Sequence, residues 1–325
     1  MEFIELRNME VTLGLENIKS PPPAIITVGT FDGVHLGHQQ IISSLCELAG
    51  KHNLASTLVT FRPHPQLILQ HKKNQPIYIL TNLNEKMCLL DRLGLERVVV
   101  IDFTREFSET GHEAFIEKVL LKKLNMRYMI IGNDHAFGKN RGGTYESLKN
   151  QSVLLNFNLK RIPPYSVDNL RISSSLIRGL LKDGKVDLAA SYLGRNYSIR
   201  GIVVKGEGRG KRLHFPTANL AVENHDKLIP KRGVYAVACK IDNAFYRGMA
   251  NIGFKPTFGG KSKTVEVHIF GFAEDIYGMN LDILFLKRLR SERKFVNEHE
   301  LIKQLNTDKS NSTRLKFDSE VQVCL

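Results

Sequence analysis

Two histidines and three glycines stand close together near the start of the chain, in the run Thr27-Val-Gly-Thr-Phe-Asp-Gly-Val-His-Leu-Gly-His38. The first two glycines let the backbone turn tightly and approach a ligand. The third, Gly37, lies at an expected helix start, where free N–H groups and the helix dipole favour an anion. His35 and His38 can donate hydrogen bonds to one phosphate chain. A lone histidine near a strand end is usually structural, but this combination predicts a polyphosphate site.

A second run, from Lys205 to Asn219, combines glycines and basic residues with a Pro-Thr-Ala-Asn motif. Its glycine N–H groups can cradle phosphates; these glycines are Gly206, Gly208 and Gly210. The Thr217 hydroxyl and the Asn219 amide oxygen are hard donors that suit Mg²⁺. The run is not a Walker A loop, because no Gly-Lys-Ser/Thr closes it. Without the Pro-Thr-Ala-Asn motif, a flexible basic hairpin would explain it equally well.

The run Val265-Glu-Val-His-Ile269 alternates apolar and polar residues and predicts a strand. Glu266 lies on the strand face opposite to its apolar neighbours. A carboxylate in that position can accept a proton as a general base. The plain alternative is a surface glutamate in a strand.

The elements that position the first run alternate between short apolar strands and helices. Strands apolar on both faces and separated by helices indicate a parallel sheet covered on each side, and ligands bind at the carboxyl ends of such strands. The expected strands span residues 25–28, 55–61, 97–102, 128–132 and 158–162, and the expected helices span residues 37–51, 84–93 and 113–124.

The character of the chain changes near Gly194, beyond which apolar and polar residues alternate with a period of two. This pattern is typical of antiparallel sheet, and so many short strands suggest a small barrel. A last helix is expected over residues 298–305. The sequence therefore predicts two domains, 1–188 and 189–325.

Composition narrows the class of protein. The chain has 325 residues, 42% of them hydrophobic, and no run approaches the ~18–20 apolar residues of a membrane span. The start of the chain lacks a secretory signal, so we expect a cytoplasmic protein without membrane contact. The cysteines lie far apart and suggest neither a zinc site nor a disulfide framework; they are Cys46, Cys88, Cys239 and Cys324.

The formal charge of +13 favours polyanionic partners, either nucleic acid or phosphorylated small molecules. The basic residues cluster around glycine and serine motifs and show no patch interleaved with aromatic residues. This favours small phosphorylated substrates and disfavours nucleic acid. The sequence gives no oligomeric state.

The histidine run resembles the signature of the bacterial FMN adenylyltransferase module, whose H-x-G-H core belongs to the wider nucleotidyltransferase superfamily. The run Ile172-Ser-Ser-Ser-Leu-Ile-Arg178 resembles a second motif of that module. The resemblance implies a Rossmann-like parallel-sheet domain in which His35 and His38 act on the α-phosphate of ATP. It also implies a set of ATP and phosphate contacts: Gly29, Phe31, Asp32, Gly33, Gly37, Ser174, Ser175 and Arg178.

Two further segments are similar to the flavin-binding parts of the same module. They are Thr60-Phe-Arg-Pro-His-Pro65 and Gly132-Asn-Asp-His-Ala-Phe-Gly138. His135 stands in the second segment where the family has an aromatic residue. The flavin contacts implied in this domain are Arg62, Pro63, His64 and Asp134.

The second half of the chain resembles riboflavin kinase. The matching segments are Tyr192–Arg195, the glycine loop with Pro216–Asn219, Asn251–Thr257, Val265–Ile269, Tyr277–Gly278 and Leu289–Phe295. The resemblance implies a small antiparallel β-barrel kinase domain with Glu266 as catalytic base, and Thr217 and Asn219 on Mg²⁺. It further implies that Asn251 and Arg290 contact the flavin.

Three residues depart from the kinase pattern: His214 and Gly271 replace a usual glycine and aspartate, and Asn196 replaces a usual proline. If the position of His214 needs a positive φ, the histidine strains the loop.

Together, the resemblances imply a bifunctional enzyme of flavin cofactor biosynthesis. Riboflavin and MgATP would give FMN, and FMN with a second ATP would give FAD and pyrophosphate. Alternatives are a chain with only one competent site, an adenylyltransferase with an impaired kinase; a nucleotidyltransferase acting on another phosphate; and a basic nucleic-acid-binding protein.

Overall fold

The computed structural model describes residues 6–69, 76–133, 137–139, 142–167, 169–206, 215–242, 244–257 and 260–318. The chain forms two compact units, Met1–Ser173 and Ser174–Leu325. This division lies before the boundary expected at residue 188, and the packing of two helices described below accounts for the difference. Each unit is described by itself.

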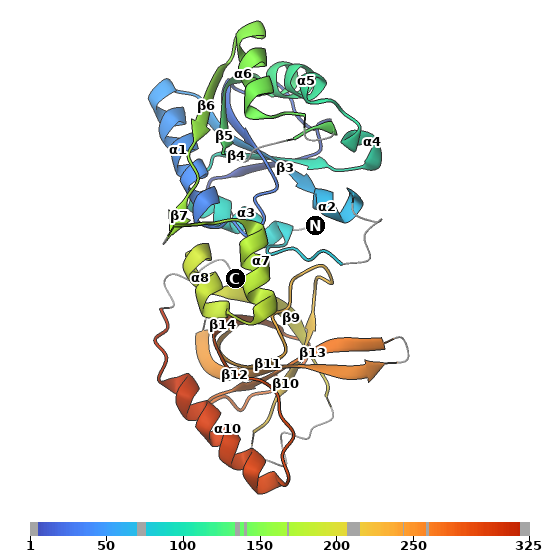
Figure 1. The fold of residues 1–325 in the computed structure, drawn as a ribbon, viewed down its shortest axis with the longest axis vertical. Helices are drawn as coiled ribbons and strands as arrows, with labels where there is room; N and C mark the ends of the chain where they lie inside the picture. Colours follow the sequence, from blue (N-terminus) through green and yellow to red (C-terminus); the bar gives the residue numbers. More distant parts are fainter. Residues whose placement is uncertain are drawn as a thin grey trace. The chain divides into compact units, whose positions relative to one another are not determined.

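The first unit is built on a six-stranded sheet whose strands are parallel throughout (Figure 1). Its strands are β1 Glu10–Leu13, β2 Ala24–Val28, β3 Ala55–Arg62, β4 Arg97–Asp102, β5 Met126–Gly132 and β6 Asn158–Ile162. A short hairpin of β7 and β8 follows, at Ser166–Val167 and Leu170–Arg171.

The strand order β1-β4-β3-β2-β5-β6 places β2 in the middle of the sheet. After β2 the chain adds β3 and β4 on one side, and it later adds β5 and β6 on the other. Ligands of open α/β sheets bind at the carboxyl ends of the strands where this order reverses. The point of reversal lies between β2 and β5, where the histidine run begins.

Helices cover both faces of this sheet, as strands apolar on both faces require. Along β2, Ile25 packs with side chains of α1 and α3, while Ile26 packs with side chains of η1 and α6 on the other face. The helices of the unit are α1 Leu36–His52, α2 Pro65–Leu69, α3 Leu83–Arg92, α4 Arg105–Ser108, α5 His112–Ala114, η1 Phe115–Lys123 and α6 Tyr145–Leu154.

The second unit is a closed antiparallel barrel with the strand order β10-β13-β12-β11-β14-β9, in which β9 pairs back with β10. Its strands are β9 Tyr197–Val204, β10 Ala218–Val222, β11 Gly233–Ile241, β12 Ala244–Thr257, β13 Gly260–Ile269 and β14 Asn280–Arg290. The alternation of apolar residues seen in the sequence thus becomes the two surfaces of one barrel wall.

Three helices complete the second unit: α7 Ser174–Asp183, α8 Val186–Leu193 and α10 Glu298–Thr313. Helix α8 packs on β14 and β9, and α7 packs on α8. The Lys231 N–H also donates to the Leu181 carbonyl of α7, at 3.0 Å. Because α7 and α8 belong to the barrel, this unit begins at Ser174. Helix α10 lies along the outside of the wall formed by β11, β12 and β14 (Figure 1).

The predicted fold class, a Rossmann-like parallel sheet followed by an antiparallel barrel, is confirmed. Two details differ. The helix expected over residues 113–124 is largely a π-helix, η1, and the last helix extends to Thr313 rather than residue 305. The sequence pattern of residues 306–313 is polar, so its helical character comes from packing on the barrel and not from an apolar stripe.

Candidate active sites

The histidine run forms the loop between β2 and α1, and its geometry fixes both imidazoles. His35 is the N-cap of α1, and its Nδ1 accepts a hydrogen bond from the His38 N–H at 3.3 Å. The rings of His35 and His38 are stacked with centroids 3.6 Å apart, and the Phe31 ring lies 4.6 Å from that of His38. The structure therefore brings the two predicted catalytic histidines together at the start of a helix.

The cap bond also fixes the proton position on His35. Since Nδ1 accepts, a neutral ring carries its proton on Nε2, which can then donate to a phosphate oxygen. The helix N-terminus at this point adds a favourable potential for an anion.

Asp32, expected among the ATP contacts, is turned into the protein. Only 1% of its surface is exposed. Its carboxylate accepts hydrogen bonds from the Leu80 N–H at 2.9 Å and the Thr81 N–H at 3.0 Å. The Gly33 N–H donates to the Thr81 hydroxyl at 3.0 Å. These contacts give Asp32 and Gly33 a structural role, in which they tie the histidine loop to the segment before α3.

Two glycines of the loop are packed closely against its aromatic rings, which leave no space for a side chain at these positions. A side chain at Gly29 would meet the Phe31 ring at 3.0 Å, and one at Gly37 would meet the His35 ring at 3.3 Å. A larger residue at either position would displace a ring of the stack.

The predicted flavin segment after β3 lies at the same carboxyl edge of the sheet. The Arg62 Nε donates to Asp102 at 2.6 Å, and the His64 Nδ1 accepts from the Gln66 N–H at 3.2 Å. Pro63 is exposed between them. These three consecutive residues therefore lie at the carboxyl edge of the sheet. Asp134 and His135 lie outside the described residues.

An aromatic cluster flanks this edge and joins segments that are distant in the sequence. Phe61, Phe103, Phe107, Phe115 and Phe137 form a chain of edge-to-face or tilted contacts with centroids 5.5–5.9 Å apart. Such geometry suits aromatic quadrupoles. It also places Phe137 of the second flavin segment against Phe115 of η1.

The serine motif lies in the second unit. Ser174 is the first residue of α7, Ser175 is exposed, and Arg178 lies one turn further along the helix. This spacing gives the helix start two hydroxyls and a guanidinium, a set that suits an anion.

In the barrel, strand pairing brings the predicted kinase residues into one row. Asn219 of β10 is directly opposite Glu266 of β13, and Glu266 is directly opposite Asn251 of β12. Directly paired residues project from the same face of a sheet. Thr217 precedes Asn219 by two residues, so an extended backbone carries it toward that face as well. The structure therefore unites one carboxylate and hard oxygen donors.

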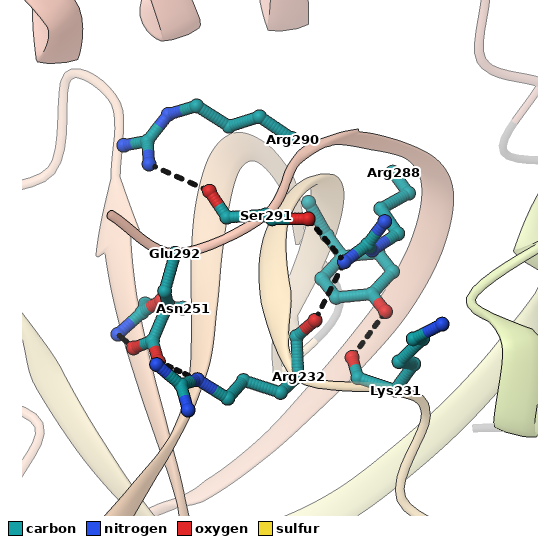
Figure 2. A network of polar contacts seen from close by, with 8 residues as sticks. Lys231, Arg232, Asn251, Arg288, Arg290, Ser291 and Glu292 are labelled. Carbon is teal, nitrogen blue, oxygen red and sulfur yellow. Dashed lines mark hydrogen bonds and ion pairs between the residues drawn. The ribbon is translucent and has the colours of Figure 1, made fainter.

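A polar network extends this row to the end of the barrel. The Asn251 Nδ2 donates to the Glu292 Oε1 at 2.9 Å, and the other Glu292 oxygen accepts from the Arg232 Nε (Figure 2). The Asn251 Oδ1 is buried and receives no hydrogen bond within the described residues. A buried acceptor that stays unpaired is costly, so this oxygen is well suited to a ligand N–H or O–H.

Arg288 supports the same end of the barrel from β14. Its Nη2 donates to the Arg232 carbonyl at 2.8 Å and to the Ser291 hydroxyl at 3.1 Å (Figure 2). The Tyr235 hydroxyl donates to the Lys231 carbonyl. Burial raises the pKa of Tyr235 to about 12, although the charge of Arg288 opposes this. Tyr235 therefore stays a neutral donor.

Arg290, expected to contact flavin or phosphate, binds elsewhere in this structure. Its Nε and Nη2 contact the Asp308 carboxylate of α10 at 2.9 and 2.8 Å. Its Nη1 donates to the Ser291 carbonyl at 3.2 Å. The guanidinium thus fastens α10 to the barrel. Strand pairing also places Arg290 in register with Asn251, because both residues pair with Val234 of β11.

His268 fixes the Pro-Thr-Ala-Asn motif through a hydrogen bond to the backbone of Pro216. Its Nδ1 lies 2.7 Å from the Pro216 carbonyl, and it is the donor because a carbonyl oxygen only accepts. Burial lowers the pKa of His268, and the hydrogen bond to Pro216 partly opposes this. The ring also packs edge-on against Phe215.

The glycine loop is described only in part, since Gly208, Gly210 and His214 lie outside the described residues. Gly206 is described, and a side chain there would come within 2.0 Å of the Asn219 amide. Of the other departures, the Asn196 side chain donates to the Phe285 carbonyl at 3.0 Å, and Gly271 has a φ of +68° that suits glycine.

Two residues of these sites were missed by the sequence reasoning: His268 and Glu292. Both lie inside segments that carry the family resemblance, so their place in those segments could have indicated them.

The first unit is a nucleotidyltransferase-type α/β domain, and the second is a β-barrel whose wall carries a carboxylate beside hard oxygen donors. A family model described as FAD synthetase matches residues 17–176, and one described as riboflavin kinase matches residues 193–316. The chain belongs to the bifunctional riboflavin kinase/FMN adenylyltransferase family.

Two relatives of that description cover nearly the whole chain. The protein from Buchnera aphidicola subsp. Acyrthosiphon pisum is 34% identical over 304 residues, which is 92% of this chain and 96% of the relative. The protein from Bacillus subtilis is 35% identical over 294 residues, or 90% of this chain and 92% of the relative.

A solved structure from Streptococcus pneumoniae shares the architecture. It is described as a macrolide-efflux protein, is 31% identical, and superposes with a TM-score of 0.87 over 95% of this chain and all of the other. Within the described residues of this chain, no helix has both the length and the hydropathy needed to cross a membrane.

Proposed function

We propose that this chain phosphorylates riboflavin to FMN in the barrel and adenylylates FMN to FAD in the α/β unit, using one ATP in each step. The observation that carries the proposal is that one chain holds both kinds of site. A stacked histidine pair stands at the start of a helix at the carboxyl edge of the parallel sheet, and Asn219 and Glu266 are paired on adjacent strands of the barrel. Family membership over both units supports it.

In the kinase step, the Glu266 carboxylate takes the proton of the ribityl hydroxyl while that oxygen bonds to the γ-phosphorus of ATP. The bond from the γ-phosphorus to the bridging oxygen breaks, and ADP leaves. Asn251 offers its buried Oδ1 to a flavin donor, with Glu292 fixing the orientation of the amide.

The donor set fits a magnesium ion, because Thr217 and Asn219 present hard oxygens on the strand that pairs with Glu266. When bound, Mg²⁺ would neutralise charge on the triphosphate. Thr217 and Asn219 would hold it, and His268 would keep the segment that carries them in place through the Pro216 carbonyl.

In the adenylyl transfer step, a phosphate oxygen of FMN bonds to the α-phosphorus of ATP, and the bond to pyrophosphate breaks. His35 and His38 stabilise the charge that develops on the α-phosphate. Gly29 and Gly37 keep space for the ring stack, and Arg62, Pro63 and His64 line the edge where the flavin would lie. Ser174, Ser175 and Arg178 would bind phosphate at the start of α7.

We assign the two activities to residues 1–188 and 189–325, so that α7 serves adenylyl transfer although it packs within the second unit. We place the enzyme in the cytoplasm, where ATP and riboflavin are both supplied. The test is a product assay in which the purified chain receives riboflavin and MgATP and the flavins are separated by chromatography. We expect FMN to appear first and FAD to follow. FMN without FAD would refute the adenylyltransferase site, and FAD formed only from added FMN would refute the kinase site.

A further inference from the structure

A buried lysine lies directly beneath the histidine loop. Only 6% of the surface of Lys86 is exposed. Its ammonium donates to the Thr30 carbonyl at 2.7 Å and lies 3.5 Å from the Thr60 hydroxyl. Thr30 follows β2 and Thr60 belongs to β3, so Lys86 joins the carboxyl ends of two adjacent strands.

Two features of this position make the charged form of a lysine unfavourable. Lys86 lies four residues after the N-cap of α3, Asn82, where the helix dipole disfavours positive charge. Burial lowers the pKa of Lys86 to about 8, and the charge of Asp32 opposes this. Buried groups with strongly shifted pKa values often belong to functional sites.

The loop above the lysine has a strained backbone. Phe31, Gly33 and Val34 have φ values of +45°, +87° and +39°. A left-handed conformation is unfavourable for Phe and especially for the β-branched Val. Such conformations persist only where the surroundings hold them, and they cluster at active sites.

Two charged groups hold this loop at two points. Lys86 binds the Thr30 carbonyl on one side of the strained residues. Asp32, within them, is fixed by the N–H groups of Leu80 and Thr81, which lie just before α3. The loop is thus attached to the N-terminal end of α3 at both points, and His35 and His38 follow it immediately.

We propose that Lys86 is a positioning residue for adenylyl transfer: by binding the Thr30 carbonyl, it holds the loop in the shape that sets His35 and His38 at the α-phosphate. This inference rests on the proposed function. It assigns no contact between Lys86 and the substrates. Its effect is therefore on the geometry of the histidines in the transition state, where a small displacement reduces the rate strongly.

The test compares K86M, K86R and the control R92M in the full chain, with FMN and MgATP as substrates. R92M removes an exposed charge from the same helix. We expect K86M to lower kcat for FAD formation about tenfold or more, with KM values within about twofold, since the binding groups stay in place. K86R keeps a cationic donor and should recover part of kcat. Kinase activity in the same samples should not change.

Rates are expressed per folded molecule, measured by near-ultraviolet circular dichroism. K86M turning over as fast as R92M would overturn the inference, as would an equal loss of both activities. If K86M does not fold, K86Q replaces it, and an unchanged kcat in K86Q would show that the ammonium is not required. A wild-type chain that forms no FAD would refute the proposed function instead, so the two failures are distinguishable.

Discussion

The ion pair between Arg290 and Asp308 provides a sharp test of how the barrel is assembled. The side chains are 18% and 2% exposed, so both charges are largely removed from water. Removing one partner of a buried pair leaves the other charge uncompensated, at a cost of about 3–5 kcal/mol. We therefore expect R290M to destabilise the barrel strongly, whether or not flavin is present.

The magnitude can be expressed as a temperature. For a unit of the size of Ser174–Leu325, each kcal/mol lost from the free energy of unfolding lowers the midpoint temperature of unfolding by about 2–4 °C. The R290M variant should therefore lose kinase activity at a temperature lower by about 6 °C or more. The double variant R290M/D308L replaces the pair by apolar side chains, and it should recover most of the loss because neither charge is then left alone.

The assay is thermal inactivation of each activity in the full chain. The adenylyltransferase midpoint should fall less than the kinase midpoint, because α7 is the part of the second unit that we assign to that site. K294M serves as the matched control, because Lys294 is an exposed cation of the same segment. The reasoning would be refuted if R290M kept the wild-type kinase midpoint and raised the KM for riboflavin. That result would support a direct contact between Arg290 and the flavin.

Three further outcomes are expected. E292L should raise the KM for riboflavin about tenfold, because the Asn251 amide loses the acceptor that orients it; an unchanged KM in steady-state kinetics would contradict this. H268N, which keeps a donor for Pro216, should retain most kinase activity, whereas H268L should lose it. Folding lowers the pKa of Lys86 from 10.5 to about 8, so the unfolded chain binds more protons than the folded chain between pH 8 and 10. Wild-type stability of the first unit should thus rise relative to K86M from pH 8 to 10, measured by thermal inactivation of FAD formation.

Local patterns were enough to predict the fold class and the histidine loop. Strands β4 and β6 have the predicted bounds, and α1 begins within one residue of the predicted start. These elements are specified by residues near one another in the sequence, such as the apolar run of β4 and the glycines before α1.

Contacts that depend on strand register could not be predicted from spacing. Glu266 lies 47 residues after Asn219, and only the pairing of β10 with β13 brings them together. The same holds for the contact between Arg290 and Asp308 of α10, which no spacing in the sequence indicates. The flavin contact of Arg290 stays a prediction. Lys86 was missed because its role depends on a carbonyl contributed by another strand end.

The central claim is that one chain carries two independent active sites, and complementation tests it most directly. With riboflavin and MgATP, H38A alone should accumulate FMN and E266Q alone should form no FMN, yet the two variants mixed should form FAD. FAD formation by either variant alone, or its absence from the mixture, would contradict the account.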